Sequence, residues 1–475
     1  MSKVQSEGKN LIVNTVLIAV GNMGAKVVSF LLLPLYTSLL TTEQYGDYDY
    51  VITIAAFLLP VVTLCLYEAM FRYLIDAKSV EDKKKIISFS FITILIISLI
   101  LISVFIFIII FTEIKYSVYL LIYTLASVAY TFFTSALRGM GNTKKYALFS
   151  SIKNIMQVVL NVLAILVLRM GVEGLLLSTI ISEFFGVFLC ILGGKIWRYI
   201  TFKNIHFSEY KSMVKYSIPL IPNNLSATII NLSDRIMITN MIGSDSNGIY
   251  AISYKFPNIF ETVYHYFYTA WSESSARMLK NEKESDEIVY NSLRRTINNF
   301  IFGLIIIAVA GMAILFRIFV KGDYIAGFTC VPILMFSIYF NCLAKYYTGL
   351  FTAYKKTFII LISTLIAAIV NVTLNIFFLK QLGIIWAATT TLIANFLMCL
   401  IRFMAIQKYV RIKFDWKFWI SAIPVTVAIV LLYDYDSWLK ISIGLIIAIL
   451  YSFIINLPTI KTLFISLKKR KNNKV

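Results

Sequence analysis

The sequence predicts an all-α polytopic membrane protein of about fourteen transmembrane helices: two parallel six-helix bundles around a central cavity, followed by two further helices. Three observations predict this fold: the composition, the recurrence of long apolar runs and an internal repeat. Hydrophobic residues make up 59% of the 475-residue chain and charged residues only 14%. Soluble chains hold about 45–50% apolar and about 25% charged residues. A soluble fold of this length has too little interior for so much apolar surface.

Apolar runs of about 18 residues or more recur along the chain, and each is long enough to cross a hydrocarbon core of ~30 Å. The first six predicted spans are residues 11–38, 48–71, 87–111, 117–137, 147–168 and 173–194. The next six are residues 216–241, 249–271, 298–320, 325–353, 357–379 and 384–406. A shorter pair follows at residues 418–433 and 441–458. The connections are short, so we expect no large soluble domain.

The chain repeats itself with a shift of roughly 200–212 residues. Gln44-Tyr45-Gly46-Asp47-Tyr48, which leads into the second span, is echoed by Ser246-Asn247-Gly248-Ile249-Tyr250, which leads into the eighth. The shift covers six spans, an even number, so the two halves keep the same orientation and predict parallel bundles with a cavity between them. We expect bundles at residues 1–210 and 211–412, and the extra helices with a basic tail at residues 413–475.

The net charge of +20 has a topological explanation. If the N-terminus is cytoplasmic, most lysine and arginine residues outside the spans fall on the cytoplasmic side. The opposite side holds only Lys115, Arg169, Arg317, Lys321, Lys380 and Lys440. This asymmetry follows the positive-inside rule and predicts that both termini are cytoplasmic. The charge therefore does not call for a nucleic-acid partner.

The sequence resembles the polysaccharide flippases, the O-antigen and capsule repeat-unit branch of the multidrug/oligosaccharidyl-lipid/polysaccharide exporter superfamily. The resemblance covers nearly the whole chain and rests on three motifs: Tyr45-Gly46-Asp47-Tyr48, Asn231-Leu232-Ser233-Asp234-Arg235-Ile236-Met237-Ile238 and Gly248-Ile249-Tyr250-Ala251-Ile252-Ser253-Tyr254-Lys255. It implies export of a lipid-linked saccharide, of undecaprenyl-pyrophosphate type, across a bacterial inner membrane. Membrane lipids and the polysaccharide polymerase machinery are the implied partners. The last two helices depart from the twelve-span members of this branch.

Several cations fall inside the predicted spans, where an ionisable group costs about 2.5–3.5 kcal/mol or more. Lys153 is about two turns from the cytoplasmic end of its span, and we expect it to extend to that interface. Guanidinium and ammonium groups are common partners of phosphate oxygens. We therefore expect an anionic substrate to bind the deeper cations, which are Lys26, Arg235, Lys255 and Lys345. The alternative is a structural role, with Asp234 neutralising a neighbouring helix and Arg235 extending outward.

Acidic groups and one histidine in the spans are candidates for ion coupling: Asp234, Glu261, His265 and Glu183. Glu261 and His265 are four residues apart, so a proton relay is one interpretation and a plain hydrogen-bonded pair is the other. Glu68 precedes Arg72 by the same spacing, which predicts a structural ion pair. The cysteines fall in apolar runs without metal-ligand spacing, and no phosphate-binding glycine loop is present. We expect neither a metal site nor a cofactor.

Two other classes share part of this pattern. A multidrug or cation antiporter of the same superfamily would favour a cavity lined by carboxylates, whereas this chain has a surplus of buried cations. A membrane enzyme of polysaccharide assembly would need a substantial external loop with acidic or histidine groups, and the outside connections are too short. A secondary transporter without an ATP site is the favoured interpretation.

Overall fold

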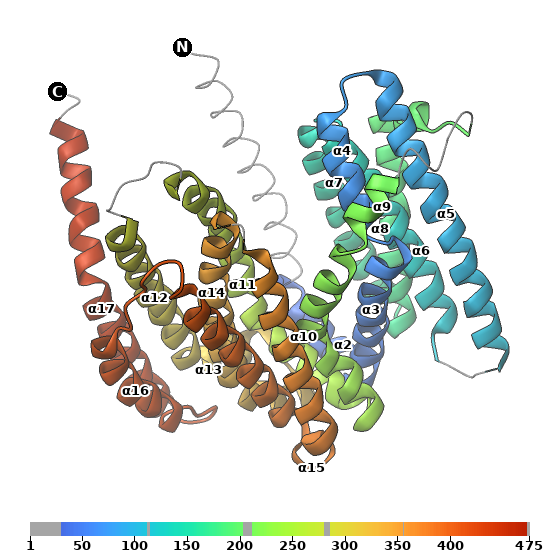
Figure 1. Cartoon of the computed structure of the whole chain (residues 1–475). Coiled ribbons are helices and arrows are strands. Elements are labelled where there is room, and N and C mark those ends of the chain that lie inside the picture. Colours follow the sequence, from blue (N-terminus) through green and yellow to red (C-terminus); the bar gives the residue numbers. More distant parts are fainter. Residues whose placement is uncertain (1–29, 112–114, 203–210, 280–285, 355, 473–475) are drawn as a thin grey trace. The chain divides into compact units, whose positions relative to one another are not determined.

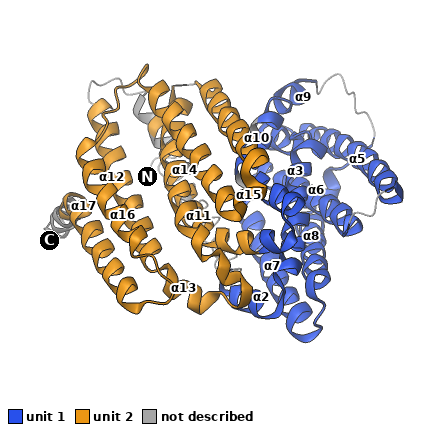
Figure 2. Ribbon diagram, turned by 90° about the horizontal axis from the view of Figure 1, so that it is seen from below, with its two compact units in different colours: residues 1–248 blue, residues 249–475 orange. Residues whose placement is uncertain are grey.

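The structure is a computed structural model that describes residues 30–111, 115–202, 211–279, 286–354 and 356–472. These residues form helices joined by short connections, and the described part of the chain contains no strand (Figure 1). The chain divides into two compact units, residues 1–248 and 249–475, which are coloured separately in Figure 2. The predicted division at residues 210 and 412 remains a prediction.

Unit 1 is built from long helices with three short ones among them. Its α-helices are α2 (Leu33–Leu39), α3 (Thr42–Val62), α4 (Leu66–Asp76), α5 (Val80–Phe111), α6 (Ser117–Gly139), α7 (Thr143–Val162), α8 (Gly171–Gly194), α9 (Lys211–Ser217) and α10 (Leu220–Met241). A π-helical turn, η1 (Leu163–Val167), follows α7, and a 3₁₀ segment, η2 (Ile196–Tyr199), follows α8. The first residues of α11 (Ser244–Leu279) belong to unit 1 and the remainder to unit 2.

Unit 2 continues with helices of 8 to 50 residues. They are α12 (Asp286–Ala310), α13 (Met312–Phe319), α14 (Val331–Ala353), α15 (Thr357–Ile406), α16 (Trp416–Leu431) and α17 (Trp438–Asn472), with a 3₁₀ segment η4 (Gly322–Cys330) before α14. The C-terminal helix α17 packs along α12: the Asn299 side chain donates to the carbonyl of Ile455, and the Asn456 side chain donates to the carbonyl of Asn299.

Each predicted span from residues 48–71 onward coincides with one helix or with two consecutive ones. The first, residues 11–38, lies largely outside the described residues. The second is interrupted between α3 and α4, because Leu64 and Cys65 take left-handed φ values of 46° and 51°. The eleventh and twelfth run together as α15, with a kink at Gly383, whose φ is 66°.

Nine helices in the described residues are long and apolar enough to cross a membrane. The helix α15 counts once although it carries two predicted spans, α16 has only 16 residues, and the polar α10 and α11 fall short. Apolar side chains such as Leu99, Phe107 and Phe111 on α5 and Ile449 and Phe453 on α17 are exposed. Exposed apolar surface on this scale marks contact with lipid.

The start of α3 is fixed by local hydrogen bonds. The Thr41 hydroxyl accepts from the backbone N–H of Gln44, and the Gln44 side chain accepts from the backbone N–H of Thr41, a capping box. From the neighbouring connection, the Lys115 ammonium donates to Asp47 at 2.6 Å and to Glu43 at 3.3 Å. The hydrogen bond to Asp47 is the main cause that raises the pKa of Lys115. Together these contacts hold the first two turns of α3 in place.

Candidate functional site

The predicted site residues fall on four helices. Arg235 and Asp234 lie on α10, and Glu183 lies on α8. Lys255, Glu261 and His265 lie on α11, and Lys345 lies on α14. Lys26 lies outside the described residues. The structure places most of the described candidates in small clusters of charged and polar groups, each within one unit.

The first cluster joins α3 to α10 and to the first turn of α11, all within unit 1. Arg235 Nη1 donates to Asp49 Oδ1 at 2.6 Å, and the two side chains are 12% and 7% exposed. Asn247 Nδ2 lies 3.0 Å from the carbonyl oxygen of Gly46 and 3.4 Å from Asp49 Oδ2. Thr42 Oγ1 donates to Asp245 Oδ1 at 2.8 Å. We call this group, Thr42, Asp49, Arg235, Asp245 and Asn247, the α3 latch.

Two glycines let the backbones in the α3 latch meet directly. A Cβ added to Gly46 would lie 1.8 Å from the carbonyl oxygen of Ser244, and one added to Gly248 would lie 2.0 Å from that of Thr42. Only glycine fits at such a contact. Gly46 and Gly248 are also the glycines of the two copies of the internal repeat. The motif that marks the repeat in sequence therefore forms a helix–helix contact in the structure.

The second cluster lies in unit 2, between α11 and α14. Lys345 Nζ donates to Glu261 Oε1 at 2.8 Å, and Asn341 Nδ2 lies 3.3 Å from the same oxygen. Both charged side chains are partly accessible, at 23% for Lys345 and 18% for Glu261. A polar group can therefore reach this ion pair without unfolding the helices. We call Glu261, Asn341 and Lys345 the α14 cluster.

An apolar pocket of about 380 Å³ also lies in unit 2. It lies between α11, α12 and α14, and its lining is almost wholly hydrophobic. Phe260 and Cys342, neighbours in sequence of Glu261 and Asn341, both contribute to the wall, together with Ile259, Val263, Tyr264, Phe267, Leu293, Thr296, Ile297, Phe300, Ile301, Leu304, Ile305 and Ile338. The α14 cluster and the pocket thus share the helices α11 and α14, although no residue of the cluster lines the pocket.

A third pair corrects the prediction for Lys153. Its ammonium does not extend to the interface: it donates to Glu183 Oε1 at 2.5 Å, and both side chains are 9% exposed. The lysine also lies over the Tyr130 ring, 4.9 Å from its centroid, and the Tyr130 hydroxyl donates to Ser150. The helices α6, α7 and α8 enclose the pair. Because a buried charge without a partner is costly, Lys153 and Glu183 pair with each other instead of extending to water.

The remaining candidates are placed more simply. Asp234 is buried on α10, Lys255 is half-buried on α11, and His265 is exposed on α11 with its ring 6.3 Å from that of Tyr268. Glu261 is engaged by Lys345 and Asn341 as described above. The proton relay through Glu261 and His265 remains a prediction.

Two pairings differ from the sequence interpretation. Arg72 pairs with Asp76, one turn further on, instead of with Glu68. Glu68 accepts from Asn224 of α10 at 2.7 Å. Arg402, near the end of the predicted span at residues 384–406, is 4% exposed within α15. Its guanidinium donates to the hydroxyls of Ser363, Thr348 and Thr364 at 2.8–2.9 Å.

Sequence reasoning missed Asp49. The predicted second span begins at residue 48, which makes Asp49 look like a boundary residue in water. The helix begins earlier, at Thr42, so Asp49 is about two turns inside it. The repeated motif around Gly46 was the available signal, because it leads directly to this carboxylate.

These features define a multi-pass membrane protein with ion pairs between its long helices. Over residues 11–272 the chain matches the family described as polysaccharide biosynthesis protein, and it belongs to that family. No curated protein matches it in sequence.

Solved structures share the fold. The lipid II flippase MurJ, in an inward closed conformation, aligns with a TM-score of 0.70 at 16% identity over 94% of this chain and 100% of that one. An inward-facing multidrug resistance MATE family transporter aligns with a TM-score of 0.60 at 15% identity over 81% and 97%. A MOP superfamily transporter from Pyrococcus furiosus aligns with a TM-score of 0.54 at 16% identity over 83% and 95%. The predicted fold class is confirmed.

Proposed function

We propose that the protein is a flippase that moves a lipid-linked oligosaccharide repeat unit, of undecaprenyl-pyrophosphate type, from the cytoplasmic to the outer leaflet. The cargo would serve assembly of a surface polysaccharide such as O-antigen or capsule. The membrane would be the bacterial inner membrane, with both termini cytoplasmic, and polymerase machinery would receive the product. The family and the fold support a transporter of this general kind. The substrate class rests on the α14 cluster and the apolar pocket in unit 2.

The single observation that carries the proposal is that the same two helices, α11 and α14, carry an accessible ion pair and line an apolar pocket in unit 2. A lipid-linked saccharide needs a cation for its phosphates, hydrogen-bonding groups for its sugars and apolar surface for its chain. Lys345, whose side chain is 23% exposed, supplies the first. The Asn341 amide is buried against Glu261 and holds that carboxylate in place. The pocket of about 380 Å³ supplies surface for part of a prenyl or acyl chain. A soluble anion would have no use for the pocket, and a plain lipid would have little use for the ion pair.

The carboxylate partners refine this proposal. Because Lys345 and Arg235 each hold a carboxylate in the structure, a substrate phosphate must exchange with Glu261 or Asp49. Such an exchange couples binding to movement: a phosphate that takes Arg235 from Asp49 releases α3 from α10. We propose that the α3 latch closes the transport pathway on one side of the membrane. It opens when the substrate phosphate binds Arg235. Asp234, Glu261, His265 and Glu183 remain the proposed groups for ion coupling, and Lys26 and Lys255 remain proposed substrate contacts.

The runner-up is a multidrug or cation antiporter, which the fold also accommodates. In the described residues, three carboxylates within the spans, Asp49, Glu183 and Glu261, each hold a cation of the protein itself. A cationic drug would have to displace that lysine or arginine, and the freed cation would then repel it. An anionic head group meets the opposite situation.

Removal of the Lys345 ammonium should reduce surface polysaccharide by about tenfold or more, because a charge-assisted contact contributes ~1.5–3 kcal/mol. The test is complementation of a strain that lacks this gene, scored as surface polysaccharide per amount of protein in the membrane. Lys345→Ala should fail, and lipid-linked repeat units should accumulate inside. Lys440→Ala is the matched control, because Lys440 also pairs with a carboxylate, Asp434 at 2.8 Å, but is half exposed. Full activity of Lys345→Ala at normal abundance would remove this lysine from the site.

A further inference from the structure

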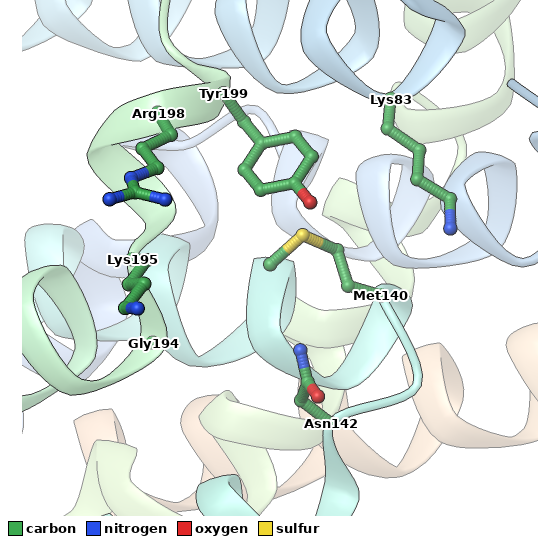
Figure 3. Close-up of a pocket in the computed structure, with 7 residues that line it drawn as sticks. All are labelled: Lys83, Met140, Asn142, Gly194, Lys195, Arg198 and Tyr199. Carbon is green, nitrogen blue, oxygen red and sulfur yellow. The ribbon is translucent and has the colours of Figure 1, made fainter. Parts of the chain in front are cut away.

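A second site lies in unit 1, away from the clusters described above. A pocket of about 220 Å³ is lined by Lys83, Met140, Asn142, Gly194, Lys195, Arg198 and Tyr199. These residues come from the start of α5, the α6–α7 junction and the end of α8 with η2. In Figure 3, Arg198 and Lys195 flank the pocket on one side and Lys83 on the other, with the Asn142 amide and the Tyr199 ring between them. By the predicted topology this is the cytoplasmic face.

The pocket is positively charged without local compensation. In the part of the chain that the structure describes, none of its three cations forms an ion pair with a carboxylate. Arg198 lies over the ring of its neighbour Trp197, 5.2 Å from the ring centroid. The nearest acidic residue in sequence, Asp82, is engaged in capping α5 through Ser79. Three cations without a carboxylate partner around one pocket favour an anion there.

The pocket lies next to the start of α7, because Asn142 lines it. Asn142 is the N-cap residue of the 20-residue helix α7, yet its side chain makes no capping hydrogen bond. The first N–H groups of α7 therefore lack a side-chain partner, and the N-terminus of a helix carries partial positive charge. Backbone donors at a helix start together with lysine and arginine side chains form a common arrangement for phosphate. The pocket is thus suited to a phosphate group.

The surroundings point to a phosphate carried by a lipid. Beside the cations, Leu192, Trp197 and Phe202 are 53%, 54% and 71% exposed. Tryptophan with basic residues at a helix end is typical of the membrane interface, where a head group meets acyl chains. The segment is also held in place, because Ser88 Oγ donates to the carbonyl of Tyr199 and accepts from the N–H of Thr201. A free phosphate would need none of these apolar side chains.

We infer that this pocket binds the phosphate of an anionic phospholipid head group at the cytoplasmic interface, and we call it the η2 pocket. Basic pockets between transmembrane helices on this side suit such head groups. The inference is separate from the transported substrate, because it concerns a resident lipid of the bilayer. Lys195 and Arg198 would hold the phosphate from one side and Lys83 from the other, with Asn142 and Tyr199 as hydrogen-bonding groups.

The test measures the thermal midpoint of the full-length purified protein as phosphatidylglycerol or phosphatidylcholine is titrated into detergent. A ligand that binds only the folded state raises this midpoint with concentration, which yields an apparent affinity. Phosphatidylglycerol should stabilise the wild type far more than phosphatidylcholine. The triple variant Lys83→Gln, Lys195→Gln, Arg198→Gln should bind phosphatidylglycerol about tenfold or more weakly, because three charged contacts are lost.

The matched control is Lys408→Gln, Arg411→Gln, Lys413→Gln, which removes the same charges from exposed positions in unit 2. It should keep the wild-type response. If the triple variant is poorly folded, the single variant Arg198→Glu takes its place, because it changes only one exposed position. It should weaken the response to phosphatidylglycerol. An unchanged response in the triple variant, or an equal loss in the control, would overturn the inference. If inorganic phosphate alone stabilised the protein as much as phosphatidylglycerol does, the inference would also be overturned, because the pocket would then be a site for a free anion.

Discussion

Replacing Asp49 by alanine should reduce transport by about tenfold or more while the protein remains in the membrane. The change leaves the Arg235 guanidinium without its 2.6 Å carboxylate contact in a place where both side chains are largely buried. Removing one member of a buried ion pair destabilises the state that contains the pair by about 3–5 kcal/mol. Under our proposal α3 contacts α10 only in the closed state of the α3 latch and separates from it during transport. The loss of the ion pair therefore destabilises the closed state. The measurement is surface polysaccharide in complemented cells, normalised to membrane abundance.

The state of the latch can be measured separately by cross-linking. Thr42 and Asp245 are in contact at 2.8 Å, so a Thr42→Cys, Asp245→Cys pair should cross-link readily in the closed state. The native cysteines are all buried. Adding Asp49→Ala should slow the cross-link. An unchanged cross-linking rate would show that the pair does not hold the latch.

A charge exchange then separates the two roles of Arg235. The double variant Asp49→Arg, Arg235→Asp restores an ion pair but moves the cation from α10 to α3. We expect it to restore the cross-link and not transport, because the phosphate contact requires the cation on α10. Recovery of both the cross-link and transport would assign Arg235 to the α3 latch alone and leave Lys345 as the phosphate contact.

Gly46→Ala should have an effect of similar size for a different reason. Its Cβ would lie 1.8 Å from the carbonyl oxygen of Ser244, a backbone atom that cannot rotate away. The first turn of α11 must then move off α3, which separates Asn247 from Asp49 and Thr42 from Asp245. We expect a severe loss of transport together with a slower cross-link between residues 42 and 245.

Gly248→Ala should reproduce the effect of Gly46→Ala, because its Cβ would lie 2.0 Å from the carbonyl oxygen of Thr42. Gly444→Ala is the control: a Cβ at this helical glycine would meet Leu432 and Ala310 at 3.7 and 3.9 Å, ordinary contact distances. It should transport normally. Wild-type transport by both latch variants would mean that α3 and α11 need not meet as closely as the structure has them.

The apolar runs of the sequence predicted the helices well, because a bilayer demands about 20 apolar residues per span whatever the neighbours are. The interruptions and kinks within these helices were less predictable. Nothing in the run at residues 48–71 marks the left-handed residues Leu64 and Cys65, since both are ordinary apolar side chains. Gly383 gave more warning, because a glycine can take a positive φ at little cost.

The charges show where sequence reasoning ends. Depth along a helix can be counted, so Arg235 and Lys345 were found. A partner on another helix depends on packing, so neither Asp49 for Arg235 nor Glu261 for Lys345 followed from spacing. Lys153 was misjudged for the same reason: its distance from the helix end suggested exposure, whereas α8 brings Glu183 against it. The pockets in the two units, formed by residues distant in sequence, could not be predicted at all.

The central claim is that this protein flips a lipid-linked saccharide, and reconstitution tests it most directly. Purified protein in vesicles that contain an undecaprenyl-pyrophosphate-linked oligosaccharide is exposed to a glycosidase added only outside. We predict that the cleaved share rises from that of the outer leaflet to nearly the whole pool, and that Lys345→Ala slows this rise while Lys440→Ala does not. Cleavage limited to the outer leaflet, in vesicles whose protein exports a cationic dye, would contradict the account and identify an antiporter instead.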